Sequence, residues 1–120
     1  MRILIVDDEI LIRDSLADYL EDDGFQVWTA ATGEEGLAIL SREPIRCCVV
    51  DMRLPGMNGD EFVVRARQVR EGLKFLIHTG SSEYTLSRRL LALGVLPEDL
   101  FYKPVVDQKF IADRLRCLTA

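Results

Sequence analysis

The sequence predicts an α/β protein in which five strands alternate with five helices around a parallel sheet. Two observations carry this prediction. Five short runs are apolar at nearly every position, which is typical of strands covered on both faces, as in a parallel sheet. The longer segments between them show the spacing of amphipathic helices and are long enough to serve as crossovers. Right-handed crossovers on both faces give a doubly wound sheet.

The apolar runs define the expected strands. Each spans three or four residues, which suits a strand and is too short for a helix. The five expected strands are Ile3–Val6, Phe25–Trp28, Cys47–Val50, Phe75–Ile77 and Leu100–Tyr102.

Helical spacing and capping signals mark the segments between the strands. A first helix carries Ile12, Leu16, Tyr19 and Leu20 on one stripe and ends at the sequence Asp22–Gly24. Capping-box spacing begins the second and third helices, which start after Thr32 with Glu35 and after Asn58 with Glu61. The fourth and fifth helices are expected over Tyr84–Leu93 and Val106–Leu118.

Length and composition limit the kinds of protein that this chain can be. A chain of 120 residues with 48% hydrophobic and 29% charged residues suits one domain, which we expect to span residues 1–120. The net charge of −5 argues against a nucleic-acid-binding surface. Cys47, Cys48 and Cys117 are too few for a disulfide framework or a zinc site. With no secretory signal or membrane-spanning run, we expect a cytoplasmic protein with reduced thiols.

Polar residues stand at the carboxyl ends of four of the five strands. In a doubly wound sheet, function gathers at this edge, near the point where the strand order reverses. The residues there are Asp7 and Asp8 after the first strand, Asp51 after the third, Thr79 after the fourth, and Lys103 with Pro104 after the fifth.

These residue types suit phosphoryl transfer. Three carboxylates at one edge would repel one another, and a divalent cation removes that conflict. An oxygen-only ligand set favours Mg²⁺ or a similar hard ion such as Mn²⁺. A nucleophilic carboxylate, a hydroxyl and an ammonium group complete a set that positions a phosphoryl group and neutralises its charge.

With these residues in place, the sequence resembles the receiver domain of two-component response regulators over essentially its whole length. The matching motifs are VDD at Val6–Asp8, DMRLPGMNG at Asp51–Gly59, HTG at His78–Gly80 and KP at Lys103–Pro104. Four such elements in order, each at an expected strand end, form a specific signal. The resemblance implies a flavodoxin-like fold with strand order 2-1-3-4-5.

The resemblance also implies a role for each matching residue. Asp51 would accept a phosphoryl group from a phosphohistidine. Asp8, Asp7 through a water molecule, Asp51 and the backbone carbonyl of Arg53 would hold Mg²⁺. Thr79 would bind the phosphoryl group and move toward it, and Lys103 would form an ion pair with it. The peptide bond between Lys103 and Pro104 would be cis, which X–Pro bonds adopt at small cost.

Two features depart from the family pattern, and two further side chains border the expected phosphoryl site. The family usually has an aromatic switch residue three positions before the lysine, where this sequence has Leu100, with Phe101 and Tyr102 beside it. The segment GVLPEDL at 94–100 replaces a shorter turn, and we expect an atypical output surface there. Arg53 and Ser81, each two residues beyond a site residue, would flank the phosphoryl group, and we expect Arg53 to affect its lifetime.

The expected function is a phosphorylation switch that acts by binding partner proteins. It is not expected to be an enzyme, beyond dephosphorylating itself. The phosphodonor would be a sensor histidine kinase or a histidine phosphotransfer protein, and the output a downstream protein target, with no direct contact to nucleic acid or membrane. A homodimer could form through the face of the fourth helix, fifth strand and fifth helix. We expect a stand-alone receiver.

Other readings of the same residues stay open at this point. The domain could belong to a longer DNA-binding or enzymatic regulator, or serve only for binding. An aspartyl phosphatase of the haloacid-dehalogenase class also uses Asp, Thr, Lys and Mg²⁺. That class has a second aspartate two residues after the nucleophile, where this chain has Arg53. Asp7 or Asp8 could cap the first helix, and Asp51 could begin a turn. His78, the only histidine, fits a hydrogen-bonded core residue as well as a catalytic one.

Overall fold

The computed structural model describes residues 1–119, and Ala120, the last residue of the expected domain, lies outside the described part. Strands and helices alternate along the chain. The strands are β1 (Arg2–Val6), β2 (Gln26–Ala30), β3 (Cys47–Val50), β4 (Lys74–Thr79) and β5 (Leu100–Tyr102). The helices are α1 (Ile10–Asp22), α2 (Gly33–Arg42), α3 (Gly59–Val69), α4 (Arg88–Ala92) and α5 (Gln108–Thr119), with a short 3₁₀ helix, η1, at Pro97–Asp99.

The five strands form one parallel sheet in the order β2-β1-β3-β4-β5, which confirms the expected fold class and strand order. The order reverses at β1, whose neighbours are β2 and β3. In register, Val6 at the end of β1 pairs with Val50 at the end of β3. The residues that follow these two strands therefore begin at the same height on the carboxyl edge of the sheet.

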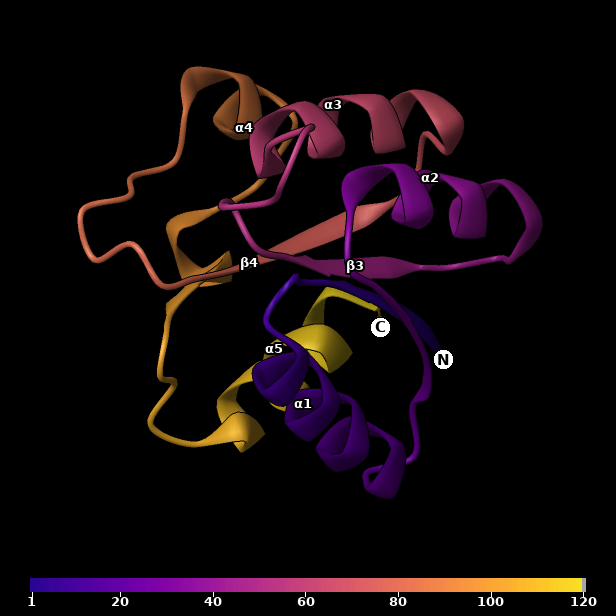
Figure 1. Ribbon diagram of the computed structural model, residues 1–120, viewed down its shortest axis with the longest axis vertical. Helices are drawn as coiled ribbons and strands as arrows, with labels where there is room; N and C mark the ends of the chain where they lie inside the picture. Colours follow the sequence, from indigo (N-terminus) through magenta and orange to yellow (C-terminus); the bar gives the residue numbers. More distant parts are fainter. Residues whose placement is uncertain (120) are drawn as a thin grey trace.

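Helices cover both faces of the sheet, α1 and α5 on one face and α2, α3 and α4 on the other (Figure 1). Alternate residues of each strand supply the two halves of the core. Ile3 and Ile5 of β1 face α1 and α5, whereas Leu4 and Val6 face the other layer. All four are essentially inaccessible to solvent, which explains why β1 is apolar from Ile3 to Val6.

The two capping signals in the sequence form as expected. Thr32 Oγ1 accepts a hydrogen bond from the Glu35 N–H at 3.1 Å and begins α2. Asn58 Oδ1 accepts one from the Glu61 N–H at 2.9 Å and begins α3. Each side chain satisfies an amide that the first turn of a helix leaves without a partner.

The expected fourth helix, Tyr84–Leu93, is wrong in its first half. Only Arg88–Ala92 is α-helical, and Ser87 begins it by accepting the Leu90 N–H at 3.2 Å. Tyr84 lies before the helix because its hydroxyl donates to Asp60 Oδ1 on α3 at 3.0 Å. Apolar spacing over residues 84–93 indicated burial correctly, but a tertiary contact holds the first residues as a loop.

The remaining boundaries differ by a few residues. β2 and β4 run two residues further toward the carboxyl edge than expected, to Ala30 and Thr79. α5 begins at Gln108 and not at Val106, because Asp107 Oδ1 accepts the Lys109 N–H at 2.9 Å and places the helix start after it. Among the described residues, no helix has the length and apolar character that crossing a membrane requires.

Candidate functional site

The ends of β1, β3, β4 and β5 meet at one place on the carboxyl edge of the sheet. Asp7 follows β1, Asp51 follows β3, Thr79 is the last residue of β4, and Lys103 follows β5. Backbone pairing fixes two of them, because the Asp51 N–H donates to Val6 O at 3.0 Å and the Lys103 N–H donates to Thr79 O at 2.8 Å. The structure thus brings together the residues that sequence spacing placed at separate strand ends.

Three carboxylates at this edge lie close enough to share a cation. One oxygen each of Asp7, Asp8 and Asp51 lies within 4.8 Å of the others. Asp7 and Asp51 are buried, at 3% and 2% exposure, whereas Asp8 is open to solvent. A cluster of carboxylate oxygens with one open side is the donor set that Mg²⁺ prefers, since this ion keeps several waters. The residues present therefore fit the expected metal.

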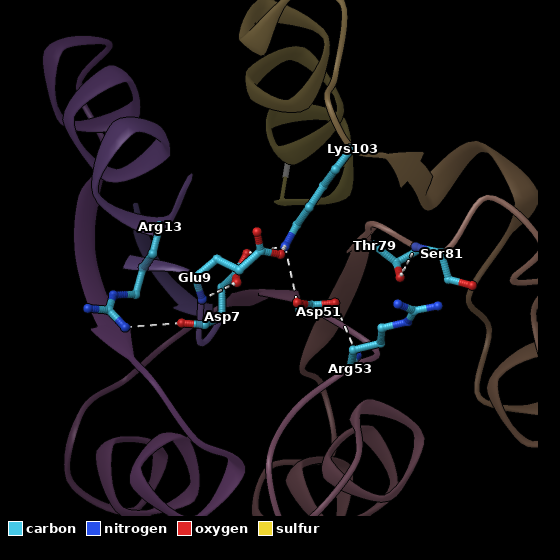
Figure 2. A network of polar contacts seen from close by, with 8 residues as sticks. All are labelled: Asp7, Glu9, Arg13, Asp51, Arg53, Thr79, Ser81 and Lys103. Atoms are coloured by element: carbon cyan, nitrogen blue, oxygen red, sulfur yellow. Dashed lines mark hydrogen bonds and ion pairs between the residues drawn. The ribbon is translucent and has the colours of Figure 1, made fainter. Parts of the chain in front are cut away.

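Lys103 is the only cation that forms an ion pair with these carboxylates among the described residues. Its Nζ lies 2.8 Å from Asp7 Oδ2, 2.9 Å from Glu9 Oε1 and 3.1 Å from Asp51 Oδ2 (Figure 2). Burial by itself would lower the pKa of the ammonium group, but the hydrogen bonds to Asp7, Glu9 and Asp51 outweigh it, so the pKa is raised. Lys103 therefore carries its charge at every physiological pH.

Asp51 is held in a tight backbone environment. Its Oδ1 accepts the N–H of Arg53 at 3.1 Å, which fixes the carboxylate at the start of the turn. A side chain at Gly59 would meet the Asp51 carbonyl oxygen at 2.6 Å, so only glycine lets α3 begin this close to the site. Burial raises the pKa of Asp51, while the Arg53 amide and Lys103 act in the opposite direction.

Thr79 and Ser81 lie on the far side of Asp51 from Asp7 (Figure 2). Thr79 is fully buried, and its Oγ1 accepts the Ser81 N–H at 3.2 Å. The exposed Arg53 side chain extends in the direction of these two residues in Figure 2. The arrangement leaves the space above Asp51 bordered by Lys103 on one side and by Thr79, Ser81 and Arg53 on the other.

The position that carries the usual aromatic switch is occupied by a packed aliphatic residue. Leu100 pairs with Ile77 in the sheet and contacts the core beneath α2, α3 and α4. The strand partner of Thr79 is instead Tyr102, whose hydroxyl donates to Tyr84 O at 2.6 Å. An aromatic residue thus lies beside Thr79, but two positions later in β5 than the family pattern places it.

The segment at 94–100 folds inward over α5. Its 3₁₀ helix ends at Asp99, which is 1% exposed. Asp99 Oδ1 accepts from Arg114 Nε at 2.6 Å and Oδ2 accepts the Leu96 N–H at 2.9 Å. The additional residues of this segment are therefore tied to α5, and Leu96 is left 45% exposed on the surface.

Two further observations concern Pro104 and His78. The Lys103–Pro104 peptide bond is cis, as the resemblance implies. His78 is 4% exposed, and its Nε2 has no hydrogen-bond partner among residues 1–119, so it is buried without the hydrogen bond expected for a core histidine. Burial, helped by Lys103, lowers the pKa of His78 to about 4, so the imidazole is neutral at pH 7.

Sequence reasoning missed Glu9 and Arg13. Glu9 contacts Lys103, and its N–H donates to Asp7 Oδ1 at 2.9 Å. Arg13 Nη1 donates to the Asp7 carbonyl oxygen at 3.1 Å. A signal for Glu9 was present in the sequence, because glutamate is not a favoured residue immediately before a helix, whereas its neighbours Asp7 and Asp8 are.

Comparisons with known proteins agree with this geometry. A family model described as the response regulator receiver domain matches residues 3–115. The chain is 34% identical over 103 residues to sporulation initiation phosphotransferase F of Bacillus subtilis, covering 86% of this chain and 82% of that relative. It is 32% identical over 109 residues to a response regulator receiver protein of an Anaeromyxobacter strain, covering 88% of this chain but 46% of that relative.

A solved structure gives the same result for the fold. The response regulator protein TrrA of Thermotoga maritima, crystallised in complex with Mg²⁺-BeF, superimposes with a TM-score of 0.83 at 26% identity, covering 98% of this chain and 97% of that one.

Proposed function

We propose that this protein is a phosphorylation switch, since the chain belongs to the response regulator receiver domain family. Receiver domains are phosphoacceptor switches that take a phosphoryl group from histidine kinases or phosphotransfer proteins. In this chain the acceptor is Asp51. The observation that supports it best is the position of Asp51, buried at a strand end between two further carboxylates and the ammonium group of Lys103.

The transfer step follows from these positions. A carboxylate oxygen of Asp51 attacks the phosphorus, the new O–P bond forms, and the N–P bond to the imidazole of the donor breaks. Asp7, Asp8, Asp51 and the backbone carbonyl of Arg53 would hold Mg²⁺ or Mn²⁺, which neutralises negative charge on the phosphoryl oxygens when bound. Lys103 neutralises a further oxygen at the other side, and the Thr79 hydroxyl hydrogen-bonds a third after releasing the Ser81 amide.

The residues at the border of the site would set how long the phosphoryl group persists. Arg53 is exposed and extends over the same side as Ser81 (Figure 2). A guanidinium group there can contact the phosphoryl oxygens or exclude the water that hydrolyses the acyl phosphate. Self-dephosphorylation is the only turnover in this proposal, which describes a switch and not an enzyme acting on a small substrate.

An exposed apolar surface beside Asp51 suits the phosphodonor protein. Leu11 on α1 is 83% exposed and Val106 in the loop before α5 is 95% exposed. They line a groove of about 590 Å³ that also reaches Lys103, so the groove is continuous with the site. An apolar surface next to the acceptor would let a kinase or phosphotransfer protein dock while its histidine reaches Asp51.

The output in this proposal is a protein contact on the face formed by α4, β5 and α5. Leu91 and Leu96 are about half exposed there, at 49% and 45%, and Tyr102 is 42% exposed. The inward-folded segment that ends at Asp99 gives this face its atypical shape. A downstream protein or a second copy of the chain would bind it, with no direct contact to nucleic acid or membrane.

The proposal also covers the cellular location of the domain and whether it acts alone or within a longer protein. We propose a cytoplasmic, stand-alone receiver spanning residues 1–120, with the alternative that it forms one part of a longer regulator. Both relatives described above contain a matching segment, but that segment makes up most of one and about half of the other.

Mass spectrometry of the intact protein tests the phosphoacceptor role. The protein is incubated with Mg²⁺ and acetyl phosphate, and wild type is compared with Asp51→Asn and with the exposed control Asp18→Asn. We expect wild type and Asp18→Asn to gain one phosphoryl group and Asp51→Asn to gain none, because an amide cannot act as the acceptor. Equal modification of Asp51→Asn would overturn the assignment.

A further inference from the structure

The side chain of Glu9 is bound where its position in the sequence does not require it. Glu9 directly precedes α1, yet its carboxylate makes no capping hydrogen bond to the helix. It reaches instead to Lys103, 94 residues away in the sequence, with Oε1 at 2.9 Å from Nζ. The interaction joins the loop after β1 to the end of β5 across the mouth of the site (Figure 2).

Three carboxylates, among them Glu9, surround the Lys103 ammonium group. Of its three N–H donors, one donates to Glu9 Oε1 at 2.9 Å and one to Asp51 Oδ2 at 3.1 Å, and Asp7 Oδ2 lies 2.8 Å from Nζ as an ion pair. A phosphoryl oxygen that is to pair with Lys103 must therefore replace one of them.

Burial decides which of the three is replaced. The side chains of Asp7 and Asp51 are 4% and 2% exposed, and each has a second oxygen held by a backbone N–H, from Glu9 and Arg53 respectively. The Glu9 side chain is 53% exposed, and water can replace Lys103 as its partner. Because one partner of the Glu9–Lys103 pair is open to solvent, losing this pair costs less than losing either buried carboxylate.

We propose that Glu9 is a positioning residue that holds Lys103 in the unphosphorylated protein and gives it up to the incoming phosphoryl group. The proposal rests on the function given above and adds a regulator of its rate. While the Glu9–Lys103 pair is intact, it lowers the positive charge available to an anionic phosphodonor and adds a negative charge at the mouth of the site. Glu9 therefore slows phosphorylation of Asp51 and makes its rate depend on the charge of the donor.

The test compares initial rates of phosphorylation for Glu9→Gln, the matched control Glu21→Gln and wild type. Glu21 is an exposed residue of α1 that loses the same charge far from the site. With acetyl phosphate at saturating Mg²⁺, we expect Glu9→Gln to react about two- to fivefold faster than wild type, which corresponds to the value of an exposed ion pair. The control is expected to react at the wild-type rate.

Donor charge and salt separate this role from a merely structural one. The gain should shrink with phosphoramidate, which is less negative than acetyl phosphate, and at high ionic strength, which screens exposed charges. A Glu9→Gln rate equal to or below that of Glu21→Gln would overturn the role of Glu9, as would an equal gain with both donors. Failure of wild type to be modified on Asp51 would instead overturn the proposed function.

Discussion

His78 illustrates how a single buried residue links stability to pH. Its imidazole is buried next to Lys103 at the carboxyl end of β4. In the unfolded chain a histidine takes up a proton near pH 6.5, whereas folded His78 does so only near pH 4. Between these values the unfolded state binds more protons, so the free energy of unfolding falls as the pH falls.

The first prediction concerns this pH dependence. From pH 7 to pH 5, wild type should lose about 2 kcal/mol more unfolding free energy than His78→Gln, which has no proton to bind. Urea unfolding followed by circular dichroism at both pH values measures the difference, and the carboxylates titrate alike in both proteins. An identical loss in the two proteins would show that His78 does not resist protonation.

Burial also distinguishes the three carboxylates that surround Lys103 in the site. The buried carboxylates fix the position of the ammonium group, and the exposed one can exchange. The rate difference described above for Glu9→Gln belongs to this scale, because it depends on one contact and on no movement of an element.

At the scale of elements, the Asp99–Arg114 pair joins the segment before β5 to α5. Asp99 is buried, and the Arg114 side chain is 22% exposed. Removing one partner of such a pair leaves a buried charge without compensation, which costs more than the pair itself contributes.

The second prediction follows from this contact. Arg114→Met should lower the free energy of unfolding by about 2–3 kcal/mol, because the Asp99 carboxylate then stays buried without its partner. The control Arg65→Met removes an exposed pair with Glu61 on α3 and should cost less than about 0.5 kcal/mol. Chemical denaturation of both variants measures the two values, and similar small losses would contradict a structural role for the pair.

The elements also show which parts of the fold and site could be predicted from the sequence. Most strand positions are apolar, and polar residues stand at the carboxyl ends of β1, β3 and β4, so parallel register alone brings Asp7, Asp51 and Thr79 to one edge. The short α4 could not be predicted, because Tyr84 is held by Asp60, 24 residues earlier. Contacts at such separation leave no periodic signal.

Contacts between residues far apart in the sequence also explain why the roles of Glu9 and Tyr102 in the site were not predicted. Glu9 and Lys103 are at opposite ends of the chain, and the shift of the aromatic residue from Leu100 to Tyr102 becomes meaningful only once the pairing of β4 with β5 is known. Motif spacing predicts Asp51 and the residues at the neighbouring strand ends, but side-chain contacts across the site require the structure.

At the scale of the whole molecule, the carboxylates of the site outnumber the single ammonium group of Lys103 that pairs with them, so repulsion remains when no divalent cation is bound. Asp7, Asp8 and Asp51 add repulsion to a chain that already carries a net charge of −5. A bound divalent cation would remove this repulsion in the folded state only, since the unfolded chain does not hold the three carboxylates together.

The third prediction is a stability change on adding Mg²⁺. At about one hundred times the dissociation constant, Mg²⁺ should raise the free energy of unfolding of wild type by about 2.7 kcal/mol. Asp8→Asn should be slightly more stable than wild type without metal and gain little from it, while Asp18→Asn should behave as wild type. Equal gains in Asp8→Asn and wild type would place the ion elsewhere.

In the proposed function Asp51 carries the phosphoryl group, and locating the modified residue is the strongest test of this assignment. After incubation with acetyl phosphate and Mg²⁺, borohydride converts an acyl phosphate of aspartate to homoserine, which peptide mass spectrometry locates. We expect homoserine at position 51, with Asp7 and Asp8 unchanged. Homoserine at position 7 or 8, or no homoserine in protein that has gained a phosphoryl group, would contradict it.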